Sequence, residues 1–196
     1  MTPAPLSEQA RAIEAYLHAK DENRPFLLAE AFDEDAALEV VVNSGAIAFP
    51  PSARGRNAIA KVLVQDFGAA YENVRTLCLG RPPGRDRDAY SCRWLVGMSS
   101  KADRTVRVGV GRYDWRFRPQ APRLAGHLTI AIEAMHVLAP AALPEVAAWL
   151  FALPCPWFPA SRAFAAAPPL EGLEPLRAWA RATGGLPARA SRRRCG

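Results

Sequence analysis

Two long runs of alternating residues constrain the fold of this chain more than any other feature. The first covers Thr105–Phe117 and the second covers Leu124–Leu138, and their period of two predicts β-strands. A short segment with two prolines separates the runs, so we expect them to form a hairpin. Gly109 and Gly111 lie within the first run, and glycines inside a strand indicate that a ligand or another backbone segment comes close.

The same alternation predicts which side chains of this hairpin share a face. Tyr113 and His127 are expected on the inner side of the sheet. Six aliphatic side chains are then expected on the outer side: Val106, Val108, Val110, Leu128, Ile130 and Ile132. Such a stripe exposes roughly a few hundred Å², which is near the limit for a monomer, so it predicts a homodimer through this surface. The alternative is that the chain beyond Pro140 folds back and covers the stripe.

The remaining segments up to residue 140 combine helical and strand patterns. Apolar residues at helical spacing, capping residues and turn residues predict three helices and four shorter strands beside the hairpin. The helices are expected over residues 7–20, 23–32 and 56–67, and the strands over 38–42, 46–49, 71–79 and 89–98. Helices followed by a run of antiparallel strands are typical of an α+β fold.

The composition changes after residue 140, which predicts a first domain, 1–140, and a helical or irregular extension with a basic tail, 141–196. Helices are predicted over Pro144–Leu153 and Leu170–Thr183, separated by a segment rich in proline, alanine and aromatic residues. The aromatic side chains of the extension either cover a pocket as a lid or fill a core: Trp149, Phe151, Trp157, Phe158 and Phe164.

Charge and composition limit the possible partners. The net charge is +6, but the arginines that supply most of the positive charge are scattered, so no nucleic-acid partner is expected. No run of about 18 apolar residues suggests a membrane span, and residues 1–20 lack the pattern of a secretion signal. The four cysteines lie far apart, which favours reduced thiols in a cytoplasmic protein. His18, His127 and His136 lack metal-binding spacing, so we expect neither a metal nor a cofactor.

Several local patterns resemble one known group of proteins. They are Tyr16, residues 31–36 (AFDEDA), residues 54–59 (RGRNAI) and residues 113–117 (YDWRF). Together with the order of helices and strands, they resemble the nuclear transport factor 2-like superfamily over about residues 7–138. That group includes SnoaL-like polyketide cyclases, ketosteroid isomerases and limonene epoxide hydrolase. The resemblance implies a curved antiparallel sheet that wraps around the N-terminal helices as a cone and binds a small apolar molecule inside.

The resemblance to ketosteroid isomerases also implies positions for site residues. Tyr16 falls on the tyrosine that donates to the oxyanion, and Tyr113 falls on the second, protonated acid. The general base falls on Val40, which cannot take a proton, so the isomerase reaction is not expected. Two further tyrosines of that site fall on Phe32 and Leu63. The same alignment implies four more inward-facing residues, Cys92, Trp94, His127 and Ala131.

His127 and the two interior tyrosines would supply the polar groups of an enzyme. The pKa of an imidazole lies near neutrality and suits a general base, whereas the simpler account is a histidine that donates to a neighbouring carboxylate or carbonyl. The phenols either polarise a ligand carbonyl or complete the core. Glu133 lies on the predicted inner face, and an ion pair with Arg93 or Arg107 explains it more simply than catalysis.

The sequence therefore predicts a protein of the SnoaL-like type that binds a small, mainly apolar ligand. One alternative is a cyclase- or isomerase-type enzyme that uses Tyr16, Tyr113 and His127. Another alternative is a dimeric protein-interaction module without a ligand. A filled interior would favour the interaction module, whereas an open cavity that touches His127 would favour binding or catalysis.

Overall fold

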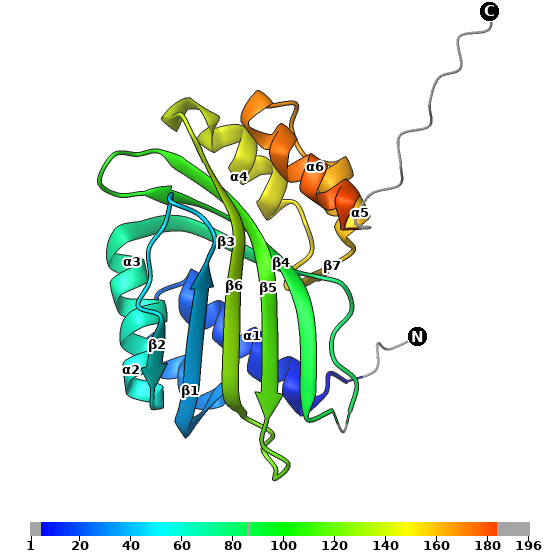
Figure 1. The fold of residues 1–196 in the computed structure, drawn as a ribbon. Coiled ribbons are helices and arrows are strands. Elements are labelled where there is room, and N and C mark those ends of the chain that lie inside the picture. The colour runs from blue at the N-terminus through cyan, green and yellow to red at the C-terminus, as the bar shows by residue number, and fades with distance from the viewer. Residues whose placement is uncertain (1–4, 86, 184–196) are drawn as a thin grey trace, which may run out of the picture.

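The computed structural model describes residues 5–85 and 87–183, and a curved seven-stranded sheet is its central feature (Figure 1). The strands are β1 (Phe32–Val42), β2 (Ser52–Arg54), β3 (Tyr71–Leu79), β4 (Ala89–Ser100), β5 (Val106–Phe117), β6 (Ala125–Leu138) and β7 (Trp157–Phe158). Their order across the sheet is β2-β1-β6-β5-β4-β3-β7. Strands β3 to β6 pair antiparallel, whereas β1 is parallel to β6 and β7 is parallel to β3, so the sheet predicted as antiparallel is in fact mixed.

Helices cover both faces of the sheet (Figure 1). On one face lie α1 (Glu8–Asp21), a 3₁₀ helix (Pro25–Glu30) and one helical segment made of α2 (Arg56–Ala60), a π-helical part (Lys61–Asp66) and α3 (Phe67–Ala70). On the other face lie short 3₁₀ turns (Pro140–Ala142 and Glu171–Leu173), α4 (Leu143–Phe151), α5 (Ala160–Ala165) and α6 (Glu174–Ala182). The predicted α+β class, with a curved sheet around the N-terminal helices, is confirmed.

Local sequence explains where the first helices begin. The Ser7 Oγ atom accepts a hydrogen bond from the Ala10 N–H at 3.1 Å, which caps α1. Ile13 and Leu17 then lie four residues apart and are buried against the sheet. Gly55 precedes α2 with a φ of 82°, a left-handed conformation that side chains rarely adopt. The predicted first and third helices are therefore present, each with its expected start.

Strand β1 differs most from the prediction. The helix predicted over 23–32 is only a 3₁₀ helix, and the strand begins at Phe32, six residues before the predicted start at Leu38. The register between β1 and β6 shifts between Phe32 and Ala37, so this part of the strand does not alternate regularly. The strand predicted over 46–49 is absent, and β2 forms instead at Ser52–Arg54, where no strand was predicted.

A bulge in β6 changes which of its side chains face inward. Val110 pairs with Ala134 and Gly111 pairs with Ile132, so Glu133 is an extra residue in β6. Because Tyr113 pairs with Ile130, these two side chains share a face. Three aliphatic residues predicted on the outer side therefore face inward: Leu128, Ile130 and Ile132. The prediction was wrong because it combined the alternation of two strands without knowing their register.

Each face of the sheet carries its own apolar core. We call the face that carries Trp94 and Tyr113 the inner face, and its core contains side chains from α1 and the other N-terminal helices. The outer face carries Val106, Val108 and Val110, which pack against the extension. The predicted alternative, in which the extension folds back over this stripe, is therefore what the structure contains.

The surface predicted for a homodimer is not available for that role. Val106, Val108 and Val110 are 0% exposed because α4, α5 and α6 cover them. The other three residues of the predicted surface are buried in the inner core. A homodimer through these six side chains would require the single chain to open, so the predicted interface is wrong.

Candidate functional site

A small cavity lies between the inner face of the sheet and the helices that cover it. The volume that the centres of water-sized molecules can occupy there is about 40 Å³. Most of its wall is apolar. Six of the side chains in this wall are Val40, Leu63, Phe67, Ile130, Ile132 and Met135.

The wall also contains four side chains with a nitrogen or oxygen atom, namely Tyr16, Lys20, Trp94 and Tyr113. Tyr16 and Lys20 are four residues apart on α1, so they lie on the same face of that helix. Trp94 on β4 and Tyr113 on β5 follow the inward alternation of their strands. Each of these polar groups therefore comes from an element with regular geometry.

Two glycines of β5 make room for this arrangement. A Cβ atom at Gly111 would lie 2.5 Å from the indole ring of Trp94, and one at Gly109 would lie 2.5 Å from the Met135 Cε atom. The close approach predicted at these glycines therefore exists. Neighbouring side chains use the space at both positions, and at Gly111 the backbone carbonyl of Ala131 in the paired strand β6 comes closer still.

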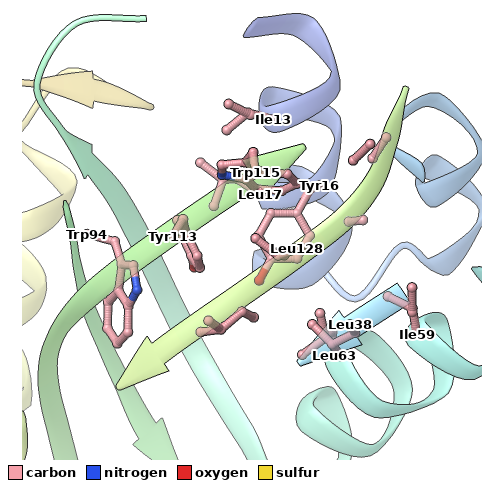
Figure 2. Packing of buried hydrophobic residues seen from close by; sticks show 14 of the residues in the cluster. Ile13, Tyr16, Leu17, Leu38, Ile59, Leu63, Trp94, Tyr113, Trp115 and Leu128 are labelled. Atoms are coloured by element: carbon pink, nitrogen blue, oxygen red, sulfur yellow. The ribbon is translucent and has the colours of Figure 1, made fainter. Parts of the chain in front are cut away.

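Aromatic side chains surround the deep side of the cavity (Figure 2). The ring centre of Tyr16 lies 5.8 Å from that of Tyr113, and Trp94 lies 5.6 Å from Tyr113. Phe32 and Trp115 pack on Tyr16 at 5.9 and 5.4 Å. The three contacts of Tyr16 are edge-on and the contact of Trp94 with Tyr113 is tilted, and together they fix the orientation of the phenols.

Burial keeps both phenols in their neutral form. Desolvation raises the pKa of Tyr16 well above the ordinary value, and the nearby Tyr113 hydroxyl offsets part of this rise. Desolvation also raises the pKa of Tyr113, and the neighbouring Tyr16 raises it further. Neither phenol can serve as an anionic base near neutral pH. Each remains available as a hydrogen-bond donor.

Lys20 is a buried cation at the edge of the cavity, and its side chain is 7% exposed. Its Nζ atom donates to Asp21 Oδ1 at 2.5 Å and to Thr76 Oγ1 at 2.8 Å. Asp21 also accepts hydrogen bonds from the Thr76 hydroxyl and the Thr76 N–H. The Phe67 ring centre lies 5.0 Å from Nζ. The Lys20 charge is therefore balanced by one carboxylate that is itself held in place.

Two buried donors of the cavity wall have no hydrogen-bond partner within the described part of the chain. They are the Trp94 Nε1–H and the Tyr16 hydroxyl. The Tyr113 hydroxyl lies near that of Tyr16, and their interaction has enough hydrogen-bond character to lower the pKa of Tyr16, but the two atoms do not reach the geometry of a hydrogen bond. In the view of Figure 2, the nitrogen edge of Trp94 and the oxygen of Tyr16 turn towards the space between these side chains. Buried polar groups are normally bonded, so both need an explanation.

The structure brings some predicted site residues together and separates others. Five of them line the cavity: Tyr16, Val40, Leu63, Trp94 and Tyr113. Phe32 and Cys92 are buried in the inner core but are not part of the cavity wall.

His127 and Ala131 were predicted on the inner face and lie on the outer face instead. They belong to the alternation opposite to Leu128 and Ile130, which are inner-core residues. The His127 Nε2 atom lies 3.1 Å from Thr129 Oγ1 and 3.8 Å from Glu39 Oε2. His127 is thus separated from the cavity by the sheet itself and cannot act as a base for a ligand bound there.

Glu133 has a different partner from the one expected, whereas three aromatic residues of the extension fill a core, which is one of the two roles expected for them. The Trp179 Nε1–H donates to Glu133 Oε2 at 2.8 Å, so an indole occupies the role predicted for an arginine. Trp149, Phe158 and Phe164 pack in the outer core, on the side of the sheet opposite to the cavity. They do not form the predicted lid.

Lys20 is the polar residue of the cavity wall that the sequence analysis missed, and Phe67 and Met135 are among the apolar ones. The signal was present, because Lys20 is one of three lysines in an arginine-rich chain and lies one helical turn after Tyr16. Thr76 lies 56 residues after Lys20 and 55 residues after Asp21 in the chain, so the buried network could not be inferred from local sequence.

Residues 5–85 and 87–183 contain neither a candidate metal site nor a candidate membrane-spanning helix. No group of three or more His, Cys, Asp or Glu side chains there could hold a metal ion. None of the helices in these ranges is long and apolar enough to span a membrane.

Comparison with known proteins identifies the fold. No family model and no curated protein matches the sequence. A candidate isomerase from Rhodopseudomonas palustris superposes with a TM-score of 0.54 at 13% identity, over 68% of this chain and 93% of that one. A candidate isomerase from Bacillus subtilis gives 0.51 at 11% identity, over 64% and 86%. A type 2 hexachlorocyclohexane dehydrochlorinase gives 0.51 at 12% identity, over 66% and 85%.

These matches confirm the predicted cone fold. At these identities they define the fold and leave the chemistry open. The fold is consistent with ligand binding or with catalysis. The chemistry of this chain must therefore be argued from its own cavity.

Proposed function

We propose that this protein binds a small, mainly apolar molecule in the cavity on the inner face of its sheet. The observation that carries the proposal is the wall itself, in which apolar side chains surround two buried donors without partners. Cavities that combine an apolar wall with a few placed polar groups are typical of ligand sites. Buried donors are normally bonded, so a ligand that supplies an acceptor would account for both of them.

The size of the cavity limits how a ligand can enter. About 40 Å³ of such space is roughly three times the 10–15 Å³ that one water molecule needs, so the cavity holds only about three water molecules. A ligand larger than a few atoms must therefore displace part of the wall. Met135 is the best candidate to move, because its unbranched side chain adapts to different shapes and lies over Gly109, which has no side chain.

A pair of adjacent valines provides a direct test. Val40 lines the cavity, whereas Val41 lies on the other face of β1 and is 49% exposed. We expect Val40→Phe to fill the cavity and weaken binding of small apolar probes such as cyclopentanone at least tenfold, measured by ligand-detected NMR. Val41→Phe should leave binding unchanged. Equal binding by both folded variants would contradict the proposal.

The enzyme alternative lacks an observation that favours it. His127, its predicted base, lies outside the cavity, and both phenols are held neutral. Lys20 is the remaining ionisable group of the described cavity wall, and its charge is paired with Asp21. Ligand binding needs none of these groups to change protonation state.

A homodimer and a cytoplasmic location stay predictions. The surface originally predicted for the dimer is buried within one chain, so any dimer needs another surface. A mass near the 21.3 kDa of one chain in light scattering would refute the dimer. A mass near twice that value would support it.

A further inference from the structure

We infer that the ligand of this cavity is an uncharged carbonyl compound, such as a small ketone or ester, whose oxygen accepts a hydrogen bond from Trp94 Nε1. This inference rests on the proposed function and narrows the class of ligand. Three observations carry it: the donor character of the polar wall, the balanced charge of Lys20 and the absence of a carboxylate from the described cavity wall.

The polar groups of the wall are mainly donors. An indole N–H and an ammonium group can only donate, and a phenol donates at least as readily as it accepts. Trp94 Nε1 has no acceptor within the described residues, although Trp94 is 3% exposed. The two hydrogen bonds of Lys20 Nζ leave one of its three hydrogens without an acceptor there. A ligand that is complementary to this wall must be an otherwise apolar molecule that carries hydrogen-bond acceptor atoms.

The charge balance of the wall separates a neutral acceptor from an anion. Asp21 lies 2.5 Å from Lys20 Nζ and receives two further hydrogen bonds from Thr76, so it is fixed beside the cation. A ligand carboxylate in the cavity would meet a cation that already has its counter-charge. It would lose its own hydration without gaining a free partner. A carbonyl oxygen loses less hydration and still satisfies the donors.

A matched pair of probes isolates the hydrogen bond from the apolar contacts. Cyclopentanone and methylenecyclopentane have nearly the same shape, but only the ketone has an acceptor. Their dissociation constants are measured by NMR titration for the wild type and two variants. Because the hydrocarbon is intrinsically more apolar, the informative quantity is the change in the ratio of the two constants on mutation.

The chain offers a matched control for the indole. Trp94 and Trp115 are both buried with an unpartnered Nε1–H, but only Trp94 lines the cavity. We expect Trp94→Phe to shift the ratio against the ketone about fivefold to tenfold, the usual net value of one hydrogen bond. Trp115→Phe should leave the ratio within about twofold of the wild type.

The charge argument has its own variant. Asp21→Asn removes the counter-charge of Lys20, so cyclopentanecarboxylate should bind this variant at least tenfold more tightly than it binds the wild type. In the wild type the ketone should bind more tightly than the carboxylate. Tighter binding of the carboxylate to the wild type would overturn the uncharged class of ligand.

The outcomes separate this inference from the function on which it rests. If neither the ketone nor the hydrocarbon binds, the proposed function fails, and the inference fails with it. If both bind and the ratio does not respond to Trp94→Phe, the cavity is a ligand site but the carbonyl assignment is wrong. A ratio that shifts equally in Trp94→Phe and Trp115→Phe would also overturn the assignment, because it would reflect a general loosening of the inner core.

Discussion

The two faces of the sheet satisfy their tryptophans differently. On the outer face, Trp149 Nε1 donates to the Ala163 carbonyl at 2.9 Å and Trp179 Nε1 donates to Glu133 at 2.8 Å. On the inner face, Trp94 and Trp115 are buried with no partner for their indole nitrogens among the described residues, and Trp157 of the extension, which packs against the inner core, also lacks one. The chain can therefore supply acceptors for buried indole nitrogens, and on the outer face it does so for both Trp149 and Trp179.

This difference suggests that the faces serve different purposes. The outer core joins the extension to the sheet, and the indoles of Trp149 and Trp179 are paired there, as expected where stability is the only requirement. The inner core keeps donors free, which costs stability unless a ligand supplies the acceptor. The rule that buried donors are paired is one of the local rules that proteins typically break at functional sites. Trp115 shows that the inner core also contains an unpaired donor away from the cavity wall, so the argument for a ligand depends on Trp94 and Tyr16.

The largest effect should come from a charge placed under the extension. Val108 is 0% exposed beneath the extension, so Val108→Asp should lower the free energy of unfolding by about 4 kcal/mol or more. Val41→Asp adds the same charge at a site on the outer side of β1 that is 49% exposed, and it should change stability by only about 0.5 kcal/mol. Urea denaturation followed by circular dichroism measures both. A mild effect of Val108→Asp would show that the extension does not cover this surface in solution.

A somewhat smaller effect is expected from Lys20. Lys20→Met leaves the Asp21 carboxylate buried with Thr76 as its remaining partner, and we expect a loss of about 3 kcal/mol. The double variant Lys20→Met/Asp21→Asn removes both charges and should recover a large part of this loss in the same denaturation assay. If the double variant were no more stable than the single one, the pair would not be coupled as described.

Two tryptophan substitutions test the comparison itself. Trp149→Phe removes a bonded indole and leaves the Ala163 carbonyl without its partner, so it should cost about 2–3 kcal/mol. Trp94→Phe removes an indole N–H that has no partner, so it should cost about 1 kcal/mol or less. Thermal and urea unfolding of the ligand-free proteins give the two values. Equal costs would show that the inner indole is satisfied in solution.

The smallest effect concerns alkaline pH. Burial raises the pKa of Tyr16 and Tyr113 above 10.0, the ordinary value that these phenols regain on unfolding. Below pH 10.0 the folded and the unfolded protein both keep the phenol protons, so burial of the neutral phenols contributes its full stability. Above pH 10.0 the unfolded protein releases these protons while the folded protein keeps them, so the free energy of unfolding falls as the pH rises. Each phenol contributes a slope of up to about 1.4 kcal/mol per pH unit. Tyr16→Phe/Tyr113→Phe should reduce this slope in unfolding curves measured between pH 9 and 11, and an unchanged slope would contradict their burial.

Much of the fold could be predicted from the sequence, because β3 to β6 and α1 have strong periodicity. Strand β3 was predicted with the bounds that the structure shows, and the hairpin of β5 and β6 was predicted to within one residue at each end. The start of β1 was missed because its register shifts between Phe32 and Ala37, and a bulge removes the period on which the prediction depends. Periodicity also cannot show that a strand such as β1 pairs parallel to β6.

The candidate site was predictable only where neighbouring strands keep a regular register. Trp94 and Tyr113 were placed on the inner face correctly, because β4 and β5 pair without a shift. His127 and Ala131 were placed wrongly, because the pairing of β6 with β5 shifts both at Glu133 and near Phe117. The Lys20 network depends on a contact between α1 and β3, which no local pattern contains.

The central claim, that Trp94 Nε1 is a free donor inside a ligand site, can be tested by NMR of the indole N–H groups. The chain has five tryptophans, so a ¹⁵N-labelled sample gives at most five indole signals, and single Trp→Phe variants assign them. On titration with cyclopentanone, we expect the Trp94 signal to move downfield and saturate, while the bonded indoles of Trp149 and Trp179 stay in place. A Trp94 signal that does not move, or moves in proportion to all the others without saturation, would contradict the account.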